Sequence, residues 1–345
     1  MRLTELVGSE LPIIQAPMAG AQGSAMTIGV CNAGALGSLP CAMLSPQGMR
    51  DELAAIKAQT ARPFNVNFFC HTPPKPDPER EVAWRAALTP YYKQYGIDPN
   101  SIPSDAGRVP FTAEFADVLS EFKPAMVSFH FGLPAADLVA RIKSWGSKVT
   151  SSATTVDEAL WLQAHGADAI VAQGVEAGGH RGHFLTRDLT TQIGTFALLP
   201  QVVRAVKVPV IAAGGIADAQ GVAAALSLGA AGVQIGTAYL LCDEAKTTPL
   251  HRQALKSEGI RHTALTNLFT GGHARGIMNR LMRELGPVSP LTPAFPMALN
   301  AIAPLRAKAE AAGSSDFSPL WSGQNASGCK EVSATELTRS LAAAL

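Results

Sequence analysis

Charge and aromatic side chains are scarce in this sequence of 345 residues. Charged residues make up 16% and aromatic residues 6%, and 28 Lys and Arg against 27 Asp and Glu give a formal net charge of +1. A nearly neutral chain lacks the excess positive charge with which proteins attract nucleic acids or anionic membranes. We therefore expect a small-molecule partner, with no nucleic acid and no membrane.

Cysteine is also sparse and follows no pattern. The five cysteines contain no CxxC pair (Cys31, Cys41, Cys70, Cys242 and Cys329). An odd number at irregular spacing is typical of reduced thiols and not of a disulfide framework. The opening segment MRLTELVGSELPIIQ carries acidic residues where a signal peptide needs an apolar core. These features predict a cytoplasmic protein.

One uncharged run, residues 219–242, is long enough to cross a bilayer at about 1.5 Å per residue. The run contains Gln234 and is interrupted by Gly229, Gly232 and Gly236. This pattern favours a short Ala-rich helix, a turn and a buried strand over a membrane span.

Apolar residues, glycine and proline are abundant instead, at 47% of the chain, 31 Gly and 24 Pro. Short apolar runs bounded by Gly or Pro recur eight times, at residues 12–18, 35–39, 64–69, 125–132, 148–153, 168–175, 209–216 and 232–240. Most are followed by a helical stretch with an N-terminal capping residue, such as Thr154 or Asp218. Strands that are apolar on both faces and alternate with helices pair in parallel through right-handed crossovers.

Two folds share this local pattern, an open doubly wound sheet and a closed barrel. Eight units, and the absence of GxGxxG after the first strand, favour a (β/α)8 TIM barrel. We predict that residues 1–242 form this barrel. Residues 71–110, Pro-rich at both ends with a short helix-like middle, form an insertion after the third strand, and residues 243–345 form a helical C-terminal extension over the barrel mouth.

Active sites of such barrels lie at the C-terminal ends of the strands. Here those ends carry small polar groups and glycine. Gly214 and Gly215, together with QIGT at residues 234–237, predict a phosphate cradle built from backbone N–H groups. With the amides of Asn67 and Gln173 and an apolar wall at Met18, the pocket suits flavin mononucleotide (FMN).

The segments IIQAPMAG, FNVNFF, VAQGVEAGGHRGHF, PVIAAGGIAD and GVQIGTAYL together resemble the nitronate monooxygenase family, formerly called 2-nitropropane dioxygenases, whose members are FMN-dependent barrel enzymes. The resemblance covers about residues 12–242, and ARGIMNRL and PLWSGQ in the tail look like the class I branch. It implies oxidation of alkyl nitronates, such as propionate 3-nitronate, by O2 to a carbonyl compound and nitrite. It leaves open a monomer or a homodimer.

The resemblance also implies roles for individual residues. The FMN contacts would be Met18, Asn67, Gln173, Gly178, Gly215, Gln234, Ile235, Gly236 and Thr237. Gly178 and Gly179 would let the backbone pass close to the flavin, and His180 would be the active-site base. On the substrate side, the insertion and the tail would contribute Tyr91, Tyr92, Lys93 and Trp321. A base is required only for a neutral nitroalkane, because a nitronate is already deprotonated.

Several alternatives stay open at this point. His130 either lines the pocket or is a buried histidine bonded to backbone. Glu176, His180 and His183 have a spacing that raises a metal site, but they lie in a glycine-rich loop without a further ligand pair, so we expect no metal. An FMN-dependent NAD(P)H:quinone reductase or enoyl reductase would use the same barrel, and a non-catalytic flavin-binding or phosphate-binding protein would use the same cradle.

Overall fold

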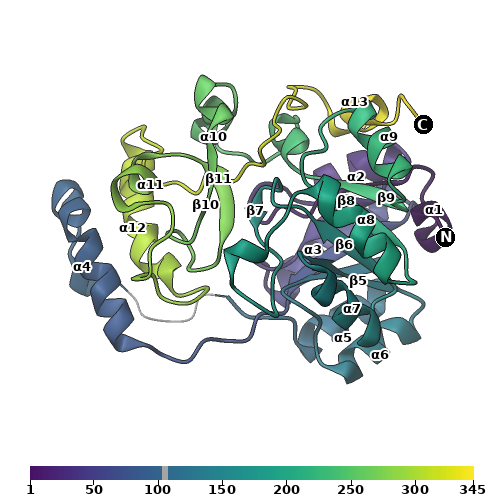
Figure 1. Cartoon of the computed structure of the whole chain (residues 1–345), viewed down its shortest axis with the longest axis horizontal. Helices are drawn as coiled ribbons and strands as arrows, with labels where there is room; N and C mark the ends of the chain where they lie inside the picture. The colour runs from purple at the N-terminus through teal and green to yellow at the C-terminus, as the bar shows by residue number, and fades with distance from the viewer. Residues whose placement is uncertain (103–107) are drawn as a thin grey trace.

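A barrel of eight parallel strands forms the centre of the molecule (Figure 1). The computed structural model describes residues 1–102 and 108–345, so residues 103–107 of the predicted insertion lie outside the described residues. The barrel strands are β1 (Ile13–Gln15), β2 (Gly37–Pro40), β3 (Phe64–Phe69), β4 (Met126–His130), β5 (Lys148–Ala153), β6 (Ala169–Gln173), β8 (Val210–Ala213) and β9 (Gly232–Ile235). Each overlaps one of the eight predicted apolar runs, and the predicted (β/α)8 barrel is confirmed.

The sheet closes on itself. Its hydrogen-bonded order is β1-β9-β8-β6-β5-β4-β3-β2, and a parallel bridge between Ile14 and Leu36 joins the two ends. Two backbone hydrogen bonds support that bridge, from Gln15 N to Leu36 O at 3.0 Å and from Leu36 N to Ile13 O at 2.9 Å. Closure leaves no exposed sheet edge in the barrel.

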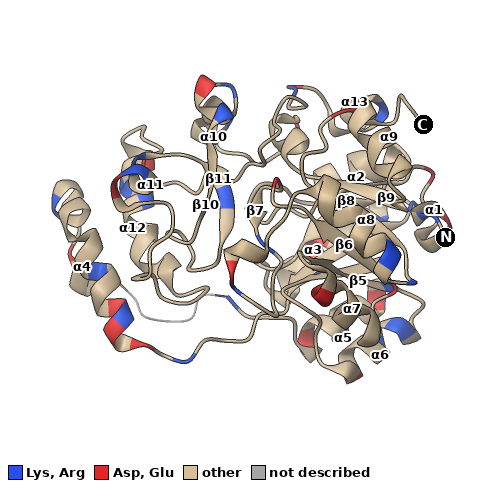
Figure 2. Ribbon diagram, viewed as in Figure 1, with Lys and Arg blue, Asp and Glu red and all other residues tan. Residues whose placement is uncertain are grey.

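The barrel strands are almost free of charge because they are buried on both faces. Lys148 is the single charged residue in their sequences, and charged side chains lie mainly on helices and loops (Figure 2). At the N-terminal end of the barrel, helix α1 (Leu3–Val7) buries Leu3 and Val7 against apolar residues such as Met126 and Ala169. This end is therefore closed, which leaves the C-terminal end for a site.

Helices pack around the outside of the barrel. They are α2 (Ser24–Asn32), α3 (Pro46–Gln59), α5 (Ala113–Phe122), α6 (Ala136–Ser144), α7 (Val156–Ala164), α8 (Thr195–Ala205), α9 (Ala219–Ser227) and α13 (Ala334–Leu341). Asp218 caps α9 as predicted, because its carboxylate accepts a hydrogen bond from Gly221 N. The cap of α7 is Thr155, one residue after the predicted Thr154, and its hydroxyl accepts from Glu158 N.

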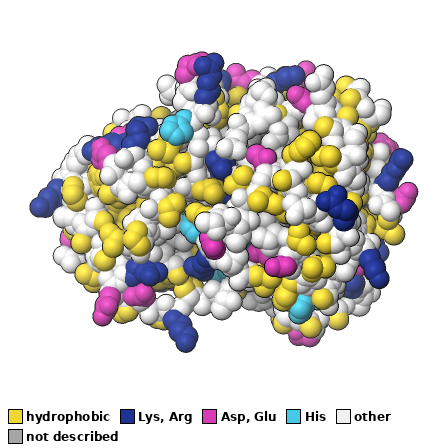
Figure 3. Space-filling view, viewed as in Figure 1, with side chains coloured by type: hydrophobic (Ala, Val, Ile, Leu, Met, Phe, Trp, Pro, Cys, Tyr) yellow, Lys and Arg dark blue, Asp and Glu magenta, His cyan; other side chains and the backbone are white. Residues whose placement is uncertain are grey.

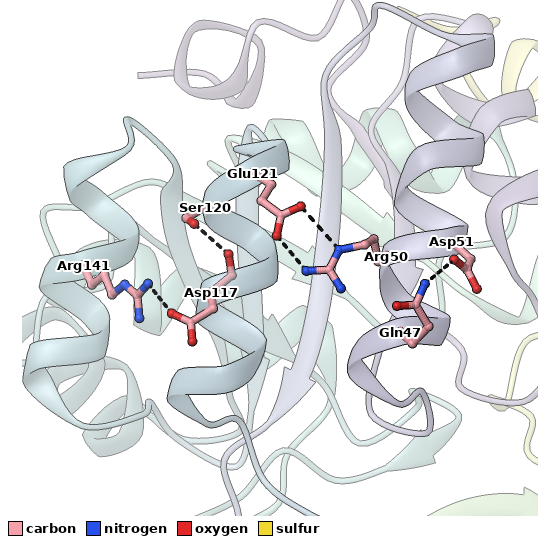
Figure 4. A network of polar contacts seen from close by, with 7 residues as sticks. All are labelled: Gln47, Arg50, Asp51, Asp117, Ser120, Glu121 and Arg141. Carbon is pink, nitrogen blue, oxygen red and sulfur yellow. Dashed lines mark hydrogen bonds and ion pairs between the residues drawn. The ribbon is translucent and has the colours of Figure 1, made fainter.

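Polar contacts between the outer helices lie at the surface. Arg50 on α3 pairs with Glu121 on α5 at 2.7 Å, and Arg141 on α6 pairs with Asp117 on α5 at 2.6 Å (Figure 4). Exposed pairs of this kind add little stability. Positive and negative side chains are interspersed on the face shown in Figure 3, in keeping with the formal net charge of +1.

A second group of elements lies beside the C-terminal end of the barrel. It consists of α4 (Pro78–Tyr95) from the insertion and of α10 (Pro249–Leu255), β10 (Thr263–Thr266), β11 (Ala274–Ile277), α11 (Arg280–Leu285) and α12 (Ala298–Ala311) from the tail. Helices α4, α11 and α12 pack together at the left of Figure 1 around a core that includes Trp84, Leu88 and Phe317. The insertion therefore contains an 18-residue helix, not the short one predicted.

The tail also holds a small sheet that the sequence analysis did not predict. Its strand order is β10-β11-β7. Strand β7 (Gly179–His180) has only two residues and lies in the glycine-rich segment that follows β6. Strand β11 pairs with β7 in antiparallel register, Ala274 opposite His180 and Arg275 opposite Gly179. The tail therefore contacts the glycine-rich loop of the barrel through backbone strand pairing.

Short 3-10 turns complete the chain: η1 (Pro99–Ser101), η2 (Leu189–Thr191), η3 (Thr237–Leu241) and η4 (Glu258–Arg261). The uncharged run 219–242 folds as α9, β9 and η3, as expected. In the described part of the chain, no helix has both the length and the apolar character needed to span a bilayer.

Candidate functional site

A cavity of about 300 Å3 lies at the C-terminal end of the barrel. Thirteen predicted site residues line it: Met18, Asn67, His130, Gln173, Gly178, Gly179, His180, Gly214, Gly215, Gln234, Gly236, Thr237 and Trp321. A second hollow, of about 370 Å3, lies between residues 72–81 and 293–297 and contains none of them. The predicted strand ends therefore meet at one place.

Four predicted residues do not line this cavity. Ile235 is buried within β9. Tyr91 and Tyr92 pack in the core shared by α4 and α12, where the Tyr92 hydroxyl donates to Ala301 O at 2.8 Å. Lys93 is exposed on the same helix. Tyr91, Tyr92 and Lys93, which we predicted on the substrate side, therefore lie away from this cavity, because the buried face of α4 packs against the tail.

One wall of the cavity is made of backbone at close approach. A Cβ atom on Gly178 would lie 2.5 Å from Gly323 N and 2.6 Å from Ser322 C. Gly214 has a φ of +114°, and a Cβ there would lie 2.8 Å from Thr195 Oγ1. Only glycine fits these positions, so the loops after β6 and β8 pack closely against neighbouring segments beside the cavity.

The amide side chains of the site divide into two kinds. Gln173 is engaged by the loop: its Nε2 donates to His180 O at 3.0 Å, and its Oε1 accepts from Gly182 N at 2.8 Å. Asn67 Nδ2 donates to Ser128 O at 3.2 Å and to Ser128 Oγ at 3.0 Å. Gln234 makes no side-chain hydrogen bond within the described residues, which leaves its amide available to a ligand.

Two side chains hold the backbone of His180 in place. Its carbonyl oxygen accepts from Gln173 Nε2 and from His130 Nε2, each at 3.0 Å. Because a carbonyl only accepts, His130 carries its proton on Nε2, and His130 Nδ1 accepts from Ser152 Oγ at 3.1 Å. Burial lowers the pKa of His130 to about 4, so this ring is neutral at pH 7. His130 therefore both lines the cavity and bonds to backbone, which joins the two interpretations that the sequence left open.

The imidazole of His180 has one polar contact in the described residues. Its Nε2 lies 2.8 Å from Thr270 Oγ1. The Thr270 hydroxyl is also 3.4 Å from Gly272 O, to which it donates, and 3.3 Å from Gly272 N, from which it accepts. With its own proton directed to Gly272 O, Thr270 accepts from His180 Nε2–H. In this arrangement the lone pair of His180 resides on Nδ1.

Aromatic rings surround His180. The ring centroids of Phe295, Trp321 and Phe69 lie 5.2, 5.5 and 6.1 Å from that of His180. Burial among these rings lowers the pKa of His180 well below the usual 6.5, and the positive charge of Arg108 adds a smaller effect in the same direction. The imidazole is therefore neutral at pH 7 and can accept a proton.

A buried arginine, missed by the sequence analysis, anchors the same loop. Arg181 has no exposed surface. Its guanidinium donates to Gly174 O and Gln173 O, each at 2.7 Å, and to Gln192 Oε1 at 3.0 Å. Its place directly after His180 was the available signal, because a charged residue inside a glycine-rich loop needs a local partner.

Thr270 and Arg108 were also missed. Both line the cavity, but Thr270 lies 90 residues from His180 and Arg108 lies near the end of the Pro-rich insertion. No periodic pattern in the sequence connects either residue to the strand ends.

The three residues whose spacing raised a metal site, Glu176, His180 and His183, have other partners. The carboxylate of Glu176 is hydrogen-bonded to the start of α8. Both carboxylate oxygens of Glu176 accept from Thr195 N at 2.9 Å, at the start of α8. His183 Nε2 lies 3.3 Å from His273 Nδ1, and burial lowers the pKa of His183 to about 3. Across residues 1–102 and 108–345, no three His, Cys, Asp or Glu side chains are grouped to hold a metal ion.

Comparison with known proteins gives concordant matches over nearly the whole chain. A family model described as nitronate monooxygenase matches residues 1–344. The chain is 42% identical over 346 residues to a nitronate monooxygenase of Paraburkholderia phytofirmans, covering 98% of this chain and 93% of that protein. It is 41% identical over 349 residues to one of Pseudomonas aeruginosa, covering 99% and 97%. A crystal structure of nitroalkane oxidase from Streptomyces ansochromogenes superimposes with a TM-score of 0.90 at 38% identity, covering 99% of this chain and 96% of that one.

Proposed function

The chain belongs to the nitronate monooxygenase family, and from this premise we propose that it is an FMN-dependent enzyme that oxidises alkyl nitronates with O2. In this reaction the nitronate carbon gains an oxygen atom and becomes a carbonyl, and the nitro group leaves as nitrite. Propionate 3-nitronate is the substrate that we propose for first tests.

We assign the phosphate of FMN to the glycine-rich wall. Gly214, Gly215 and Gly236 stand at the ends of β8 and β9, and all three line the cavity. Their lack of side chains lets a phosphate approach main-chain N–H groups, as in other barrels. Gly178 and Gly214 also lie too close to Gly323, Ser322 and Thr195 to carry a side chain, which fixes the main chain beside this wall.

The polar edge of the flavin ring is assigned to amides and the apolar face to Met18. Gln234, which has no partner in the described chain, and Asn67, whose Oδ1 accepts no hydrogen bond from described residues, would bind the ring edge. Gln173 would act by holding the loop, because both ends of its amide are engaged there. When bound, FMN supplies the capacity to accept electrons from the nitronate and pass them to O2.

We assign to His180 the removal of a proton from neutral nitroalkanes. Nδ1 would receive the proton from the carbon that bears the nitro group, while Nε2–H stays on Thr270. Burial among the surrounding aromatic rings lowers the pKa of His180 and keeps the imidazole unprotonated at pH 7, so its lone pair is free to accept a proton. A preformed nitronate has no such proton to lose.

The observation that carries the proposal is the position of His180, which contacts Thr270 at 2.8 Å and lines the same cavity as Gly214, Gly215 and Gly236. The test is His180→Asn, assayed with nitroethane and with its preformed nitronate. General base catalysis contributes about 10²- to 10⁴-fold. We therefore expect kcat/KM for nitroethane to fall by at least about 100-fold, and kcat/KM for the nitronate to fall far less.

His183→Asn is the matched control for disturbance of the loop. His183 lies three residues away and is also buried, but it does not line the cavity. The control should preserve the ratio of the two kcat/KM values. Equal losses on both substrates in His180→Asn would remove His180 from the role of base.

A further inference from the structure

Three cationic side chains line the cavity, and two of them are neutralised. Arg306 Nε lies 2.7 Å from Glu310 Oε1, and Lys246 Nζ lies 3.5 Å from Glu52 Oε1. The third, Arg108, forms no ion pair with any carboxylate in the part of the chain that the structure describes. Among the described residues, Arg108 is therefore the cavity cation that has no carboxylate partner of its own.

The surroundings of Arg108 are apolar. Its guanidinium carbon lies 5.9 Å from the ring centroids of both Phe69 and Phe295. Burial lowers the pKa of Arg108 from its usual 12.5, which shows that its charge is poorly solvated. A cation in such a place is costly until an anion joins it.

The same two rings contact the proposed base. Phe295 lies 5.2 Å and Phe69 lies 6.1 Å from the His180 ring, centroid to centroid. Arg108 is also the foremost charge acting on the imidazole of His180. A small molecule with its reacting carbon at His180 therefore has its other end within the reach of Arg108.

We propose that Arg108 binds a carboxylate on the substrate, remote from the carbon that reacts, and so selects carboxylated nitronates over plain alkyl nitronates. This inference rests on the proposed function. A guanidinium presents two parallel N–H donors that match the two oxygens of a carboxylate, and its stacking on aromatic rings fixes the plane of that fork. The carboxylate supplies the negative charge that pairs with Arg108. The nitronate group at the other end of the substrate then lies beside His180, where we expect the flavin ring.

The test compares two nitronates of matched length on the flavin-loaded protein. Propionate 3-nitronate carries the carboxylate, and the nitronate of 1-nitropropane carries a methyl group in its place. Loss of a charge-assisted hydrogen bond weakens binding by about one to two orders of magnitude. Arg108→Gln should therefore lower the ratio of kcat/KM values, carboxylated over methyl, by about 10- to 100-fold, mainly through KM, and Arg108→Lys should retain part of it.

Arg306→Gln is the matched control, because it removes a cavity cation that Glu310 already neutralises. It should leave the substrate ratio close to that of the unmodified chain. A ratio unchanged in Arg108→Gln, an equal fall for both nitronates, or an equal change of the ratio in Arg306→Gln would each overturn the proposal.

A binding measurement separates this inference from the proposed function. Succinate resembles propionate 3-nitronate in having a planar anionic group at each end and does not react. Calorimetry should show binding of succinate that weakens at least about 10-fold in Arg108→Gln. If the unmodified protein oxidises neither nitronate but loses succinate binding in this variant, the proposed reaction fails and the anion site stands. If succinate binds both proteins equally, the anion site fails.

Discussion

At the scale of single residues, the chemistry depends on which nitrogen of His180 carries the proton. Thr270 accepts from Nε2 because its own proton is directed to Gly272 O. Nδ1 is then the basic atom. In the proposed mechanism, Thr270 is thus a positioning residue, which would act on the substrate only through the imidazole.

Thr270→Val tests this role. Loss of the acceptor frees the imidazole to exchange tautomers and rotate, and a lost hydrogen bond of this kind is worth about 1 kcal/mol. We expect kcat/KM for neutral nitroalkanes to fall about 5- to 10-fold and that for preformed nitronates to change less, with Thr270→Ser restoring most of the loss. Equal kinetics in Val and Ser variants would contradict the assignment.

The pH profile gives a second readout of the same pair. A base is active when deprotonated, so kcat/KM for neutral nitroalkanes rises with pH through the pKa of His180. Because burial lowers that pKa well below 6.5, the rise should be complete before pH 6.5 and the profile flat at pH 7. In Thr270→Val the acid limb should shift, whereas a purely structural effect would lower the whole profile without moving it.

Residues near the strand ends were predictable and residues from elsewhere were not. Asn67 lies within β3, Gln234 lies within β9 and His180 lies in the loop after β6, and the fold brings these strand ends together. Thr270 and Arg108 reach the site from the tail and the insertion. The position of Tyr91 and Tyr92 away from the cavity could not be foreseen, because an aromatic pair on a helix does not indicate which neighbour it will face.

At the scale of elements, the site is built where the tail meets the loop after β6. Strand β7 pairs with β11, and Gly178 lies against the main chain of Ser322 and Gly323. Gly323 N in turn donates to Thr237 Oγ1 at 2.9 Å. The loop after β6, the tail and the start of η3 therefore meet at Gly323, beside the cavity.

Gly178→Ala tests the importance of that contact. The added Cβ would lie 2.5 Å from Gly323 N, and main-chain atoms have little freedom to retreat. Overpacking of this kind costs about 1–3 kcal/mol. We expect a lower melting temperature and a flavin content reduced at least about five-fold, measured as absorbance per chain after gel filtration.

Gly48→Ala serves as the control, since Gly48 lies in α3 and its nearest contact would be Ser45 Oγ at 3.4 Å. Alanine favours a helix over glycine by about 1 kcal/mol. This variant should keep full flavin content. Normal flavin content in Gly178→Ala would show that the tail can shift without harm to the cradle.

The barrel strands were predictable because each is a continuous apolar run between turn residues, and their number indicated closure. The sheet β10-β11-β7 was not, because β7 has only two residues and its partner lies more than 90 residues further along the chain. Pairing over such a distance leaves no local pattern to detect.

At the scale of the whole molecule, a closed barrel supplies strand ends to the cavity, and the insertion and the tail supply further lining residues such as Arg108 and Trp321. Helix α1 and its apolar contacts close one end, and the cavity at the other end contains residues of both parts. The barrel can stay the same while the residues added by the insertion and the tail change, and this explains how one fold can host different reactions. A reductase on this barrel would need room for a nicotinamide over the same flavin face.

The most direct measurement is oxygen consumption by the flavin-loaded protein on addition of propionate 3-nitronate, with nitrite assayed in the same sample and NADH added to a second sample without air. The proposed function predicts nitronate-dependent oxygen uptake with release of nitrite, and a flavin spectrum that NADH leaves oxidised. Bleaching of the flavin by NADH, without any oxygen uptake on nitronate, would contradict it and place the protein among the reductases.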